Sequence, residues 1–237
     1  MVARRARSGG AGAVGFVSML DDSDGGRLVL DRVARRRLFE AFIATIFAHE
    51  SELTDLDRAI GDGDHGINLA RGFKAVAAQL DALSAQPLGP ALKELGKRLV
   101  MSVGGASGPL YGTLFMALGD ALPADRPLTH EGFVAAAATA VAAVRSRGKS
   151  DTGQKTMLDV LVPVLDELRA GGSHTTQRLV QRAEEAAAAT VPMRAQRGRA
   201  AFLGDRSIGH LDPGARSAQL LVTAACASVG APAGGTP

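Results

Sequence analysis

Apolar side chains recur with helical spacing from residue 28 onward. In the stretch DRVARRRLFEAFIATIFAHE they fall at positions i, i+1, i+4, i+5, i+8 and i+9, along one face of a helix. Asp31, at the start of this stretch, is a residue type that caps helix N-termini. No segment of the chain alternates apolar and polar residues convincingly, as a half-buried strand would. The pattern therefore predicts an all-α fold. The residues of the first stripe are Leu38, Phe39, Phe42, Ile43, Ile46 and Phe47.

Further helical segments follow along the chain, with short connections between them. The breaks carry glycine, proline and polar clusters such as SAQPLGP, DALPADRPLT, RGKSDTG and AGGS. Thr129 and Ser173 are expected N-caps. With no internal repeat and no second domain, residues 28–230 are predicted to form one domain of about eight helices. The expected segments are Ile67–Ala85, Leu88–Ser102, Pro109–Leu122, Glu131–Arg147, Lys155–Ala170, His174–Ala189 and Ala215–Val229.

The two ends of the chain differ from the helical part. Residues 1–27 begin with basic residues and run through a short glycine-rich stretch into acidic residues without a convincing cleavage site. We therefore expect a flexible tail here rather than a signal peptide. Residues 231–237 are predicted to be a frayed tail. No apolar run approaches the about 20 residues that span a bilayer, so no membrane contact is expected.

Composition narrows the classes of function. Hydrophobic residues make up 46% and charged residues 22% of the 237 positions, as in an ordinary globular protein. The net charge is +3, aromatic residues are 4%, and no Lys/Arg stripe is interleaved with aromatics, so nucleic-acid binding is not expected. The single cysteine, Cys226, lies in an apolar run and fits a reducing cytoplasm.

Three aspartates, Asp57, Asp62 and Asp64, crowd into the stretch LDRAIGDGDHGINLARGF. Carboxylates held this close in a water-accessible loop repel one another unless a cation lies between them. Oxygen ligands favour Mg²⁺ or Ca²⁺ over zinc. The spacing does not match an EF-hand, because Phe73 stands where its bidentate glutamate would be. Mg²⁺ bridging the carboxylates to phosphates fits best, and an exposed acidic turn is the alternative.

Three more glycine-rich loops follow, at residues 102–113, 147–159 and 197–217. In SVGGASGPLYGT, glycines lead into a helix N-terminus, whose free N–H groups suit an anion such as phosphate; a tight helix–helix turn is the alternative. A Walker A loop ending in Gly148-Lys149-Ser150 is excluded. The required first glycine is Ala143, and the residues before it read as helix.

Together, IGDGDHGINLARGF, GGASGPLYGT, GQKTMLDVLVP and GRAAFLGDRSIGHLDPGA closely resemble the DhaL family. This family comprises the nucleotide-binding subunit of dihydroxyacetone kinase and the C-terminal domain of single-chain ATP-dependent kinases. The resemblance covers about residues 30–230, with the motifs in order. It implies an antiparallel barrel of eight helices, with the nucleotide site at one end.

The resemblance also implies roles for individual residues. Asp57, Asp62 and Asp64 would hold two Mg²⁺ ions that bridge the phosphates of ADP or ATP. Departures from the family pattern are Gln154, where the family usually has an acid, and Phe202, which lacks the hydroxyl of the usual aromatic residue. The nucleotide-binding residues would be His65, Gly66, Ile67, Asn68, Ala106, Ser107, Gly148, Met157, Arg199, Asp212, Pro213 and Gly214.

Nothing in the sequence binds a small ketone. In the DhaL family that role belongs to a separate K-type subunit (DhaK type), whose histidine holds dihydroxyacetone, so no catalytic residue of this kind is expected in this chain. Two phosphoryl donors stay open: a phosphotransferase-system protein (DhaM type) that recharges a bound ADP, or exchangeable ATP. A different class of function, a nucleotide-sensing module that binds a transcription factor, would show the same metal site.

Overall fold

The computed structural model describes residues 30–123 and 128–230. The first described helix, α2 (Arg32–Ala48), begins where the carboxylate of Asp31 accepts a hydrogen bond of 2.7 Å from the Ala34 N–H, which confirms the expected cap. Its apolar stripe faces the core, where Phe39 and Ile46 are fully buried. The expected tails at residues 1–27 and 231–237 lie outside the described residues.

Helices make up nearly all of the ordered structure, and the described residues contain no strand. α6 begins and ends where the sequence predicts, and α7, α8, α10 and α11 do so within about two residues. Thr129 caps α8, as expected, by accepting a hydrogen bond from the Gly132 N–H. The remaining elements are α3 (Glu50–Ile60), α4 (His65–Ala77), α5 (Leu80–Ala85), α6 (Leu88–Ser102), α7 (Ser107–Ala121), α8 (His130–Gly148), α9 (Leu158–Ala170), α10 (Thr175–Ala188), the 3₁₀ helix η1 (Arg199–Ser207) and α11 (Pro213–Gly230).

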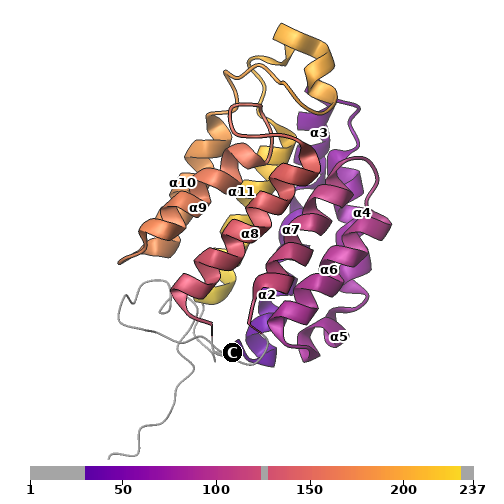
Figure 1. Ribbon diagram of the computed structural model, residues 1–237. Helices are drawn as coiled ribbons and strands as arrows, with labels where there is room; N and C mark the ends of the chain where they lie inside the picture. Colours follow the sequence, from indigo (N-terminus) through magenta and orange to yellow (C-terminus); the bar gives the residue numbers. More distant parts are fainter. Residues whose placement is uncertain (1–29, 124–127, 231–237) are drawn as a thin grey trace, which may run out of the picture.

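Eight of these helices close into a ring (Figure 1). Each contacts the next in the order α2, α4, α6, α7, α8, α9, α10 and α11, and α11 contacts α2 again. Neighbours in the ring run in opposite directions. The predicted all-α antiparallel barrel of about eight helices is therefore confirmed for the described part of the chain.

The interior of the ring is one large hydrophobic core. The rings of Phe42 and Phe115 meet across it, from α2 and α7, with centroids 5.8 Å apart. α6 and α7 lie unusually close because their glycines face each other: a Cβ on Gly96 would lie 2.6 Å from the carbonyl oxygen of Gly112. This close packing extends directly from the loop that joins the two helices, so the loop is held on a rigid support.

Two of the expected helices differ from the prediction at their boundaries. The segment expected to be continuous over Ile67–Ala85 breaks at Ala78 and Gln79, where the chain turns so that α5 can pack against α2 and bury Leu83. The helix expected from Lys155 begins at Leu158 instead. The carboxylate of Asp159 accepts hydrogen bonds from the N–H groups of Gly153 and Thr156, which holds the preceding residues in a turn.

Two further expectations were wrong. Ser173 does not cap α10; His174 occupies the N-cap position in a left-handed conformation, and its side chain makes no capping hydrogen bond. Helix α3 was missed, and with it the helical setting of Asp57. Leu53, Asp57 and Ile60 share its buried face, and this helical spacing was visible in the sequence.

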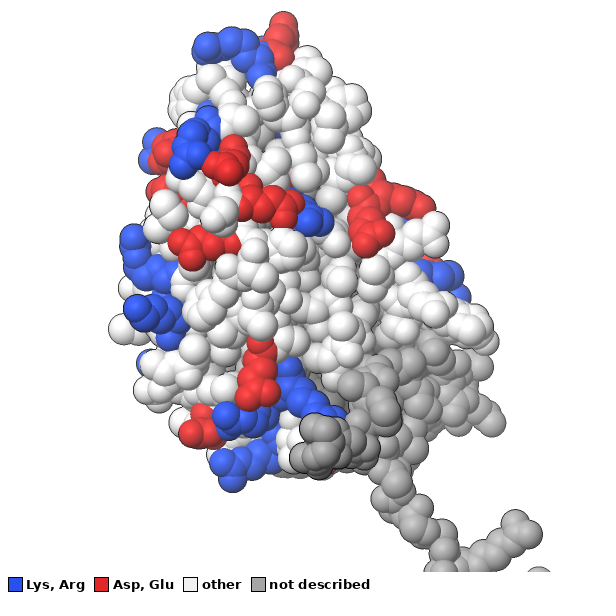
Figure 2. Space-filling model, turned by 180° about the vertical axis from the view of Figure 1, so that it is seen from behind, with Lys and Arg blue, Asp and Glu red and all other residues white. Residues whose placement is uncertain are grey.

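The described helices and one face of the surface bear on the expected absence of membrane and nucleic-acid contacts. None of the described helices is both long enough and apolar enough to cross a bilayer. In Figure 2, the described Lys and Arg side chains lie interspersed with Asp and Glu. On the face drawn there, the basic side chains do not form a continuous positive footprint.

Candidate nucleotide and metal site

The glycine-rich connections singled out in the sequence lie together at one end of the barrel. They lie at the end that carries η1, at the top of Figure 1. These connections join α3 to α4, α6 to α7, α8 to α9, and α10 to α11. Because neighbouring helices are antiparallel, alternate connections reach the same end. The fold thus gathers segments that are more than a hundred residues apart in sequence into one place.

The three aspartates form a tight cluster at this end. One carboxylate oxygen from each of Asp57, Asp62 and Asp64 lies within 4.8 Å of the others. Asp57 is buried in α3, and its Oδ2 accepts hydrogen bonds from the N–H groups of Asp64 (2.8 Å) and His65 (3.2 Å). These bonds fold the connecting loop back over the end of α3. The aspartate nearest the barrel core therefore positions the other two.

The cluster fits a hard divalent cation. Its donors are all carboxylate oxygens, which Mg²⁺ and Ca²⁺ prefer. The loop also leaves room around Oδ1 of Asp57, because residue 61 is glycine; a Cβ there would lie 2.1 Å from that oxygen. Three neighbouring carboxylates repel one another without a positive charge between them, and burial of Asp57 increases this cost.

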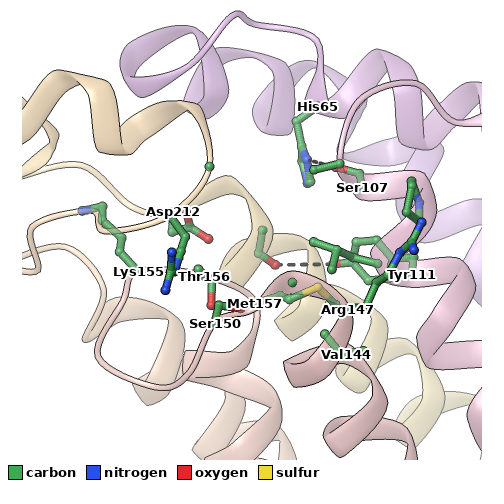
Figure 3. A pocket seen from close by; sticks show the side chains of 17 residues that line it. His65, Ser107, Tyr111, Val144, Arg147, Ser150, Lys155, Thr156, Met157 and Asp212 are labelled. Atoms are coloured by element: carbon green, nitrogen blue, oxygen red, sulfur yellow. Dashed lines mark hydrogen bonds between the residues drawn. The ribbon is translucent and has the colours of Figure 1, made fainter.

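A cavity of about 350 Å³ opens beside the cluster, between the four connections (Figure 3). His65, directly after the last aspartate, lies in its wall and links it to the carboxylates. Its apolar wall comes from α7, α8 and the turn before α9, through Leu110, Val144 and Met157. Of the expected nucleotide-binding residues, the cavity is lined by His65, Ala106, Ser107, Gly148, Met157, Asp212 and Gly214.

The other expected residues lie around this cavity without lining it. Gly66 is buried where α4 packs on α3, and Ile67 is exposed. Asn68 is buried with its amide against the glycine loop: a Cβ on Gly104 would lie 3.0 Å from the Asn68 Oδ1. Pro213 is the first residue of α11, and Arg199, the first residue of η1, bonds to Asp62 instead of lining the cavity.

A buried chain of hydroxyl groups runs behind His65. The Nδ1 of His65 lies 2.9 Å from the Oγ of Ser107, and the Nε2 of His65 lies 2.9 Å from the Oγ of Ser217. The hydroxyl of Tyr111 lies 2.6 Å from that same Oγ of Ser217. Burial lowers the pKa of His65 to about 4, against a smaller opposing effect of the Asp64 charge. The imidazole is therefore neutral at pH 7, and its contacts orient the Ser107 hydroxyl at the cavity.

Asp212 is the second perturbed group in the cavity wall. Burial raises its pKa to about 7, although it accepts a hydrogen bond of 2.7 Å from the Ala215 N–H and feels the charge of Lys155. Its position at the start of α11 places a carboxylate over the helix N-terminus, where it acts as a cap. Asp212 can thus carry or release a proton near pH 7.

Several residues that line or support this site had no predicted role. Tyr111 and Ser217 lie within two of the glycine-rich stretches singled out in the sequence, but no role was given to either residue. Lys155 and Asp159 lie within the GQKTMLD stretch that carries part of the family resemblance, but no role was given to them. For Lys155, the available signal in the sequence was a charged residue within an otherwise apolar helix start. Lys155 is fully buried and lines the cavity.

Comparison with known proteins decides the family. The model of the DAK2 domain matches residues 59–227. The chain belongs to the DAK2-domain family. Among DAK2-domain relatives, the "PEP-dependent dihydroxyacetone kinase, ADP-binding subunit DhaL" of Escherichia coli is 46% identical over 75% of this chain and 88% of its own length. A second such DhaL subunit, from Listeria innocua, is 40% identical over 82% of this chain and 94% of its own length.

Solved structures support the fold of this DAK2-domain chain. The native dihydroxyacetone kinase of C. freundii superimposes with a TM-score of 0.66 at 23% identity, over 96% of this chain. The chain spans 38% of the length of that kinase. A second structure of the kinase, in complex with AMP-PNP and Mg²⁺, gives a TM-score of 0.65 at 24% identity. At these identities the likeness shows the shared fold alone.

Proposed function

We propose that this chain is the nucleotide-binding subunit of a dihydroxyacetone kinase. It carries ADP or ATP with two Mg²⁺ ions and transfers a phosphoryl group to dihydroxyacetone held by a separate K-type subunit. The observation that carries this proposal is the position of the Asp57–Asp62–Asp64 cluster directly beside the cavity, with His65 shared between them. The names of the DhaL relatives support the same activity.

The carboxylate cluster is the proposed metal site. Asp57, Asp62 and Asp64 would hold Mg²⁺, which when bound neutralises charge on the nucleotide phosphates. Asp57 contributes from a fixed helix, while Asp62 and Asp64 contribute from the loop that its Oδ2 holds in place. Phosphoryl transfer depends mainly on positioning and on neutralising charge. The chain's own task is therefore to keep three carboxylates at a fixed distance from the phosphates.

The cavity is the proposed nucleotide site. Its volume lies in the range of small-molecule sites, roughly 300–1,000 Å³. Leu110, Val144 and Met157 offer an apolar wall for a flat base. Ala106 and Ser107 stand at the N-terminus of α7, where free N–H groups favour a phosphate. The neutral His65 holds the Ser107 hydroxyl in place without adding charge.

The acceptor and its subunit belong to the same proposal. The DhaL relatives are named as an ADP-binding subunit of dihydroxyacetone kinase, so dihydroxyacetone is proposed to be held by a K-type partner. Phe202 and Ile208, 90% and 44% exposed, add apolar surface at the η1 end of the barrel. This supports a docking surface at the loops around Asp62, Gly105, Gln154 and Asp205.

The phosphoryl donor is proposed to be a phosphotransferase-system protein of the DhaM type, with ADP retained in the site. The support is that the names of the DhaL relatives include "PEP-dependent" and "PTS-dependent". No observation favours the alternative of a nucleotide-sensing regulator over the kinase, and the relatives' names point to the kinase.

Calorimetry tests the proposed site. The chain should bind ADP in the presence of Mg²⁺. Asp62→Ala should weaken this binding more than about tenfold, because loss of a metal ligand leaves the negative charge of the phosphates less compensated. Asp55→Ala is the matched control, since Asp55 is exposed in α3 and pairs with Arg58 outside the cluster. Equal ADP affinity in the two variants would contradict the assignment.

A further inference from the structure

Lys155 is a buried cation with an unusual setting. Its side chain is only 1% exposed, and its backbone has a φ of 61°, in the left-handed region that a lysine rarely adopts. Asp159 holds this turn through hydrogen bonds from the N–H groups of Gly153 and Thr156, on either side of the lysine. The turn around Lys155 is therefore fixed in a conformation that directs this side chain into the interior of the protein.

The ammonium group of Lys155 meets backbone carbonyls instead of a carboxylate. Its Nζ donates to the carbonyl oxygens of Thr190 (2.8 Å), Val191 (3.3 Å), Met193 (3.1 Å) and His210 (2.5 Å). An ammonium group has three protons, so these four acceptors saturate it. Burial lowers the pKa of Lys155, and the charge of Asp212 opposes that shift.

The four carbonyls belong to the two ends of one loop. Residues 190–193 and residue 210, here called the neck, flank residues 194–209, here called the neck loop. Two further hydrogen bonds join the chain on either side of the neck loop. The Gly209 N–H donates to the Val191 carbonyl (2.8 Å), and the Asp212 N–H, two residues after His210, donates to Oγ1 of Thr190 (3.1 Å). Lys155 reaches the neck from a third segment and bonds to both of its ends.

The neck loop supplies part of the site. Arg197 and Gly198 line the cavity, and Arg199 bonds to Asp62 of the carboxylate cluster. The loop packs on the barrel only through a small cluster, in which Ala195, Ala200 and Leu203 meet Ile60 of α3, separate from the main core. Gln196 also bonds to the turn that precedes Lys155: its backbone N–H donates to the Gln154 carbonyl (3.1 Å), and its Nε2 donates to the Gly153 carbonyl (3.0 Å). The position of the loop over the cavity therefore depends on this turn and on how the ends of the loop are held.

We propose that Lys155 is a positioning residue for nucleotide binding, whose ammonium group holds the neck closed and thereby places Arg197, Gly198 and Arg199 at the cavity and the carboxylate cluster. This inference rests on the proposed function of the cavity. The positive charge is essential, because a neutral side chain would leave the four carbonyls without their shared donor in a buried place. The barrel, which has its own core, does not need this contact.

The test compares Lys155→Met with Leu95→Ala, a truncation in the main core on α6. Both should lower the melting temperature. Only Lys155→Met should weaken ADP binding, by roughly tenfold or more, in calorimetry at a temperature where both variants are folded. Hydrogen exchange should become faster in the neck loop of Lys155→Met and stay unchanged in α6 and α7.

Chemical rescue tests whether the charge itself matters. In Lys155→Ala, propylammonium reproduces the carbons and the ammonium group that were removed, whereas propanol has a similar size without charge. Propylammonium should restore slow hydrogen exchange in the neck loop and tighter ADP binding, and propanol should restore neither.

Several outcomes would overturn the proposal: wild-type ADP affinity in Lys155→Met, unchanged exchange in its neck loop, or equal rescue by propanol. Loss of the whole fold in both Lys155 variants would also overturn it, because the lysine would then support the barrel. If the wild-type chain bound no ADP, the proposed function would fail, while the exchange measurement would still test the neck.

Discussion

The Nε of Arg199 lies 2.7 Å from Oδ2 of Asp62, so the neck loop is bonded directly to the carboxylate cluster. Both side chains are partly exposed, and the ion pair alone contributes little to stability. Its importance is local. Arg199 is a positive charge that would compete with a cation for the same carboxylate oxygen, and it would connect occupancy of the proposed metal site to the position of the loop.

This competition gives the first prediction. Without nucleotide, Arg199→Gln should bind Mn²⁺, a spectroscopic substitute for Mg²⁺, roughly two- to fivefold more tightly than the wild type, because a competing charge is removed. Arg194→Gln is the matched control, since Arg194 lies in the same loop but pairs with Asp205 at 3.1 Å. Electron paramagnetic resonance of free Mn²⁺ measures the affinity. Weaker Mn²⁺ binding in Arg199→Gln would contradict the competition.

The second prediction concerns the room around Asp57. In Gly61→Ala the new Cβ would lie 2.1 Å from the Asp57 Oδ1, so the carboxylate or the loop must move. Mg²⁺-dependent ADP binding should fall by about tenfold or more, as for direct loss of a ligand. Gly132→Ala is the control, because its nearest contact is at 3.2 Å, to the capping side chain of Thr129 in α8. Similar ADP affinity in the two variants would show that the cluster tolerates displacement.

The third prediction is thermal. A ligand that binds only the folded state adds about 2.7 kcal/mol to the free energy of unfolding at a hundredfold excess over its dissociation constant. ADP with Mg²⁺ should therefore raise the melting temperature by several degrees. Bound ADP would contact four separate connections of the barrel, which line the cavity, and would thereby join them. Differential scanning fluorimetry with ADP–Mg²⁺, Mg²⁺ alone and Ca²⁺ alone checks it. A response to Ca²⁺ alone and none to ADP–Mg²⁺ would favour a calcium site.

The fourth prediction follows from the raised pKa of Asp212, about 7 in the folded chain against about 3.9 in an unfolded chain. Between these values the folded state holds a proton that the unfolded state lacks, so this group's contribution to the free energy of unfolding falls as pH rises from about 4 to about 7. The pKa of His65 is lowered to about 4 in the folded chain, against about 6.5 in an unfolded chain. The contribution of His65 to the free energy of unfolding therefore rises with pH between these values. The two effects must therefore be separated by mutation.

Asp212→Asn separates them, because the amide keeps an oxygen that can accept the Ala215 N–H. As pH rises from about 5 to about 7, the wild type should lose stability relative to Asp212→Asn, by at most about 1.4 kcal/mol for each step of one in pH, and the loss should level off above about pH 8. Chemical denaturation without nucleotide measures the difference. A difference that does not change with pH would show that Asp212 is ionised throughout.

Local signals in the sequence were sufficient for the helices, whereas their arrangement as a barrel was expected from the resemblance to the DhaL family. Apolar spacing, the Asp31 and Thr129 caps and glycine-rich breaks each act within a few residues. The break between α4 and α5 was missed because no breaker residue marks it; the turn is imposed by packing of Leu83. Tertiary contact overrode local propensity there.

The site was predicted in part for the same reason. Asp62 and Asp64 stand in a loop whose glycines are visible in the sequence, whereas Asp57 is in a helix, and its hydrogen bonds to the loop depend on the fold. The contacts of Lys155 join residues 35 to 55 positions apart, and those of Ser217 reach back 106 and 152 positions. No local pattern encodes such pairs, so the contacts of these residues could be found only in three dimensions.

Reconstituted phosphoryl transfer is the decisive test of the proposed kinase activity. Formation of dihydroxyacetone phosphate is measured with the chain alone, with a K-type subunit alone and with both, supplied either with phosphoenolpyruvate and a phosphotransferase system including a DhaM-type protein or with ATP. Product should form only with both subunits and a donor, and Asp62→Ala should abolish it. Turnover by the isolated chain at a rate typical of kinases, roughly 1–100 per second, or equal turnover with Asp62→Ala, would contradict the account.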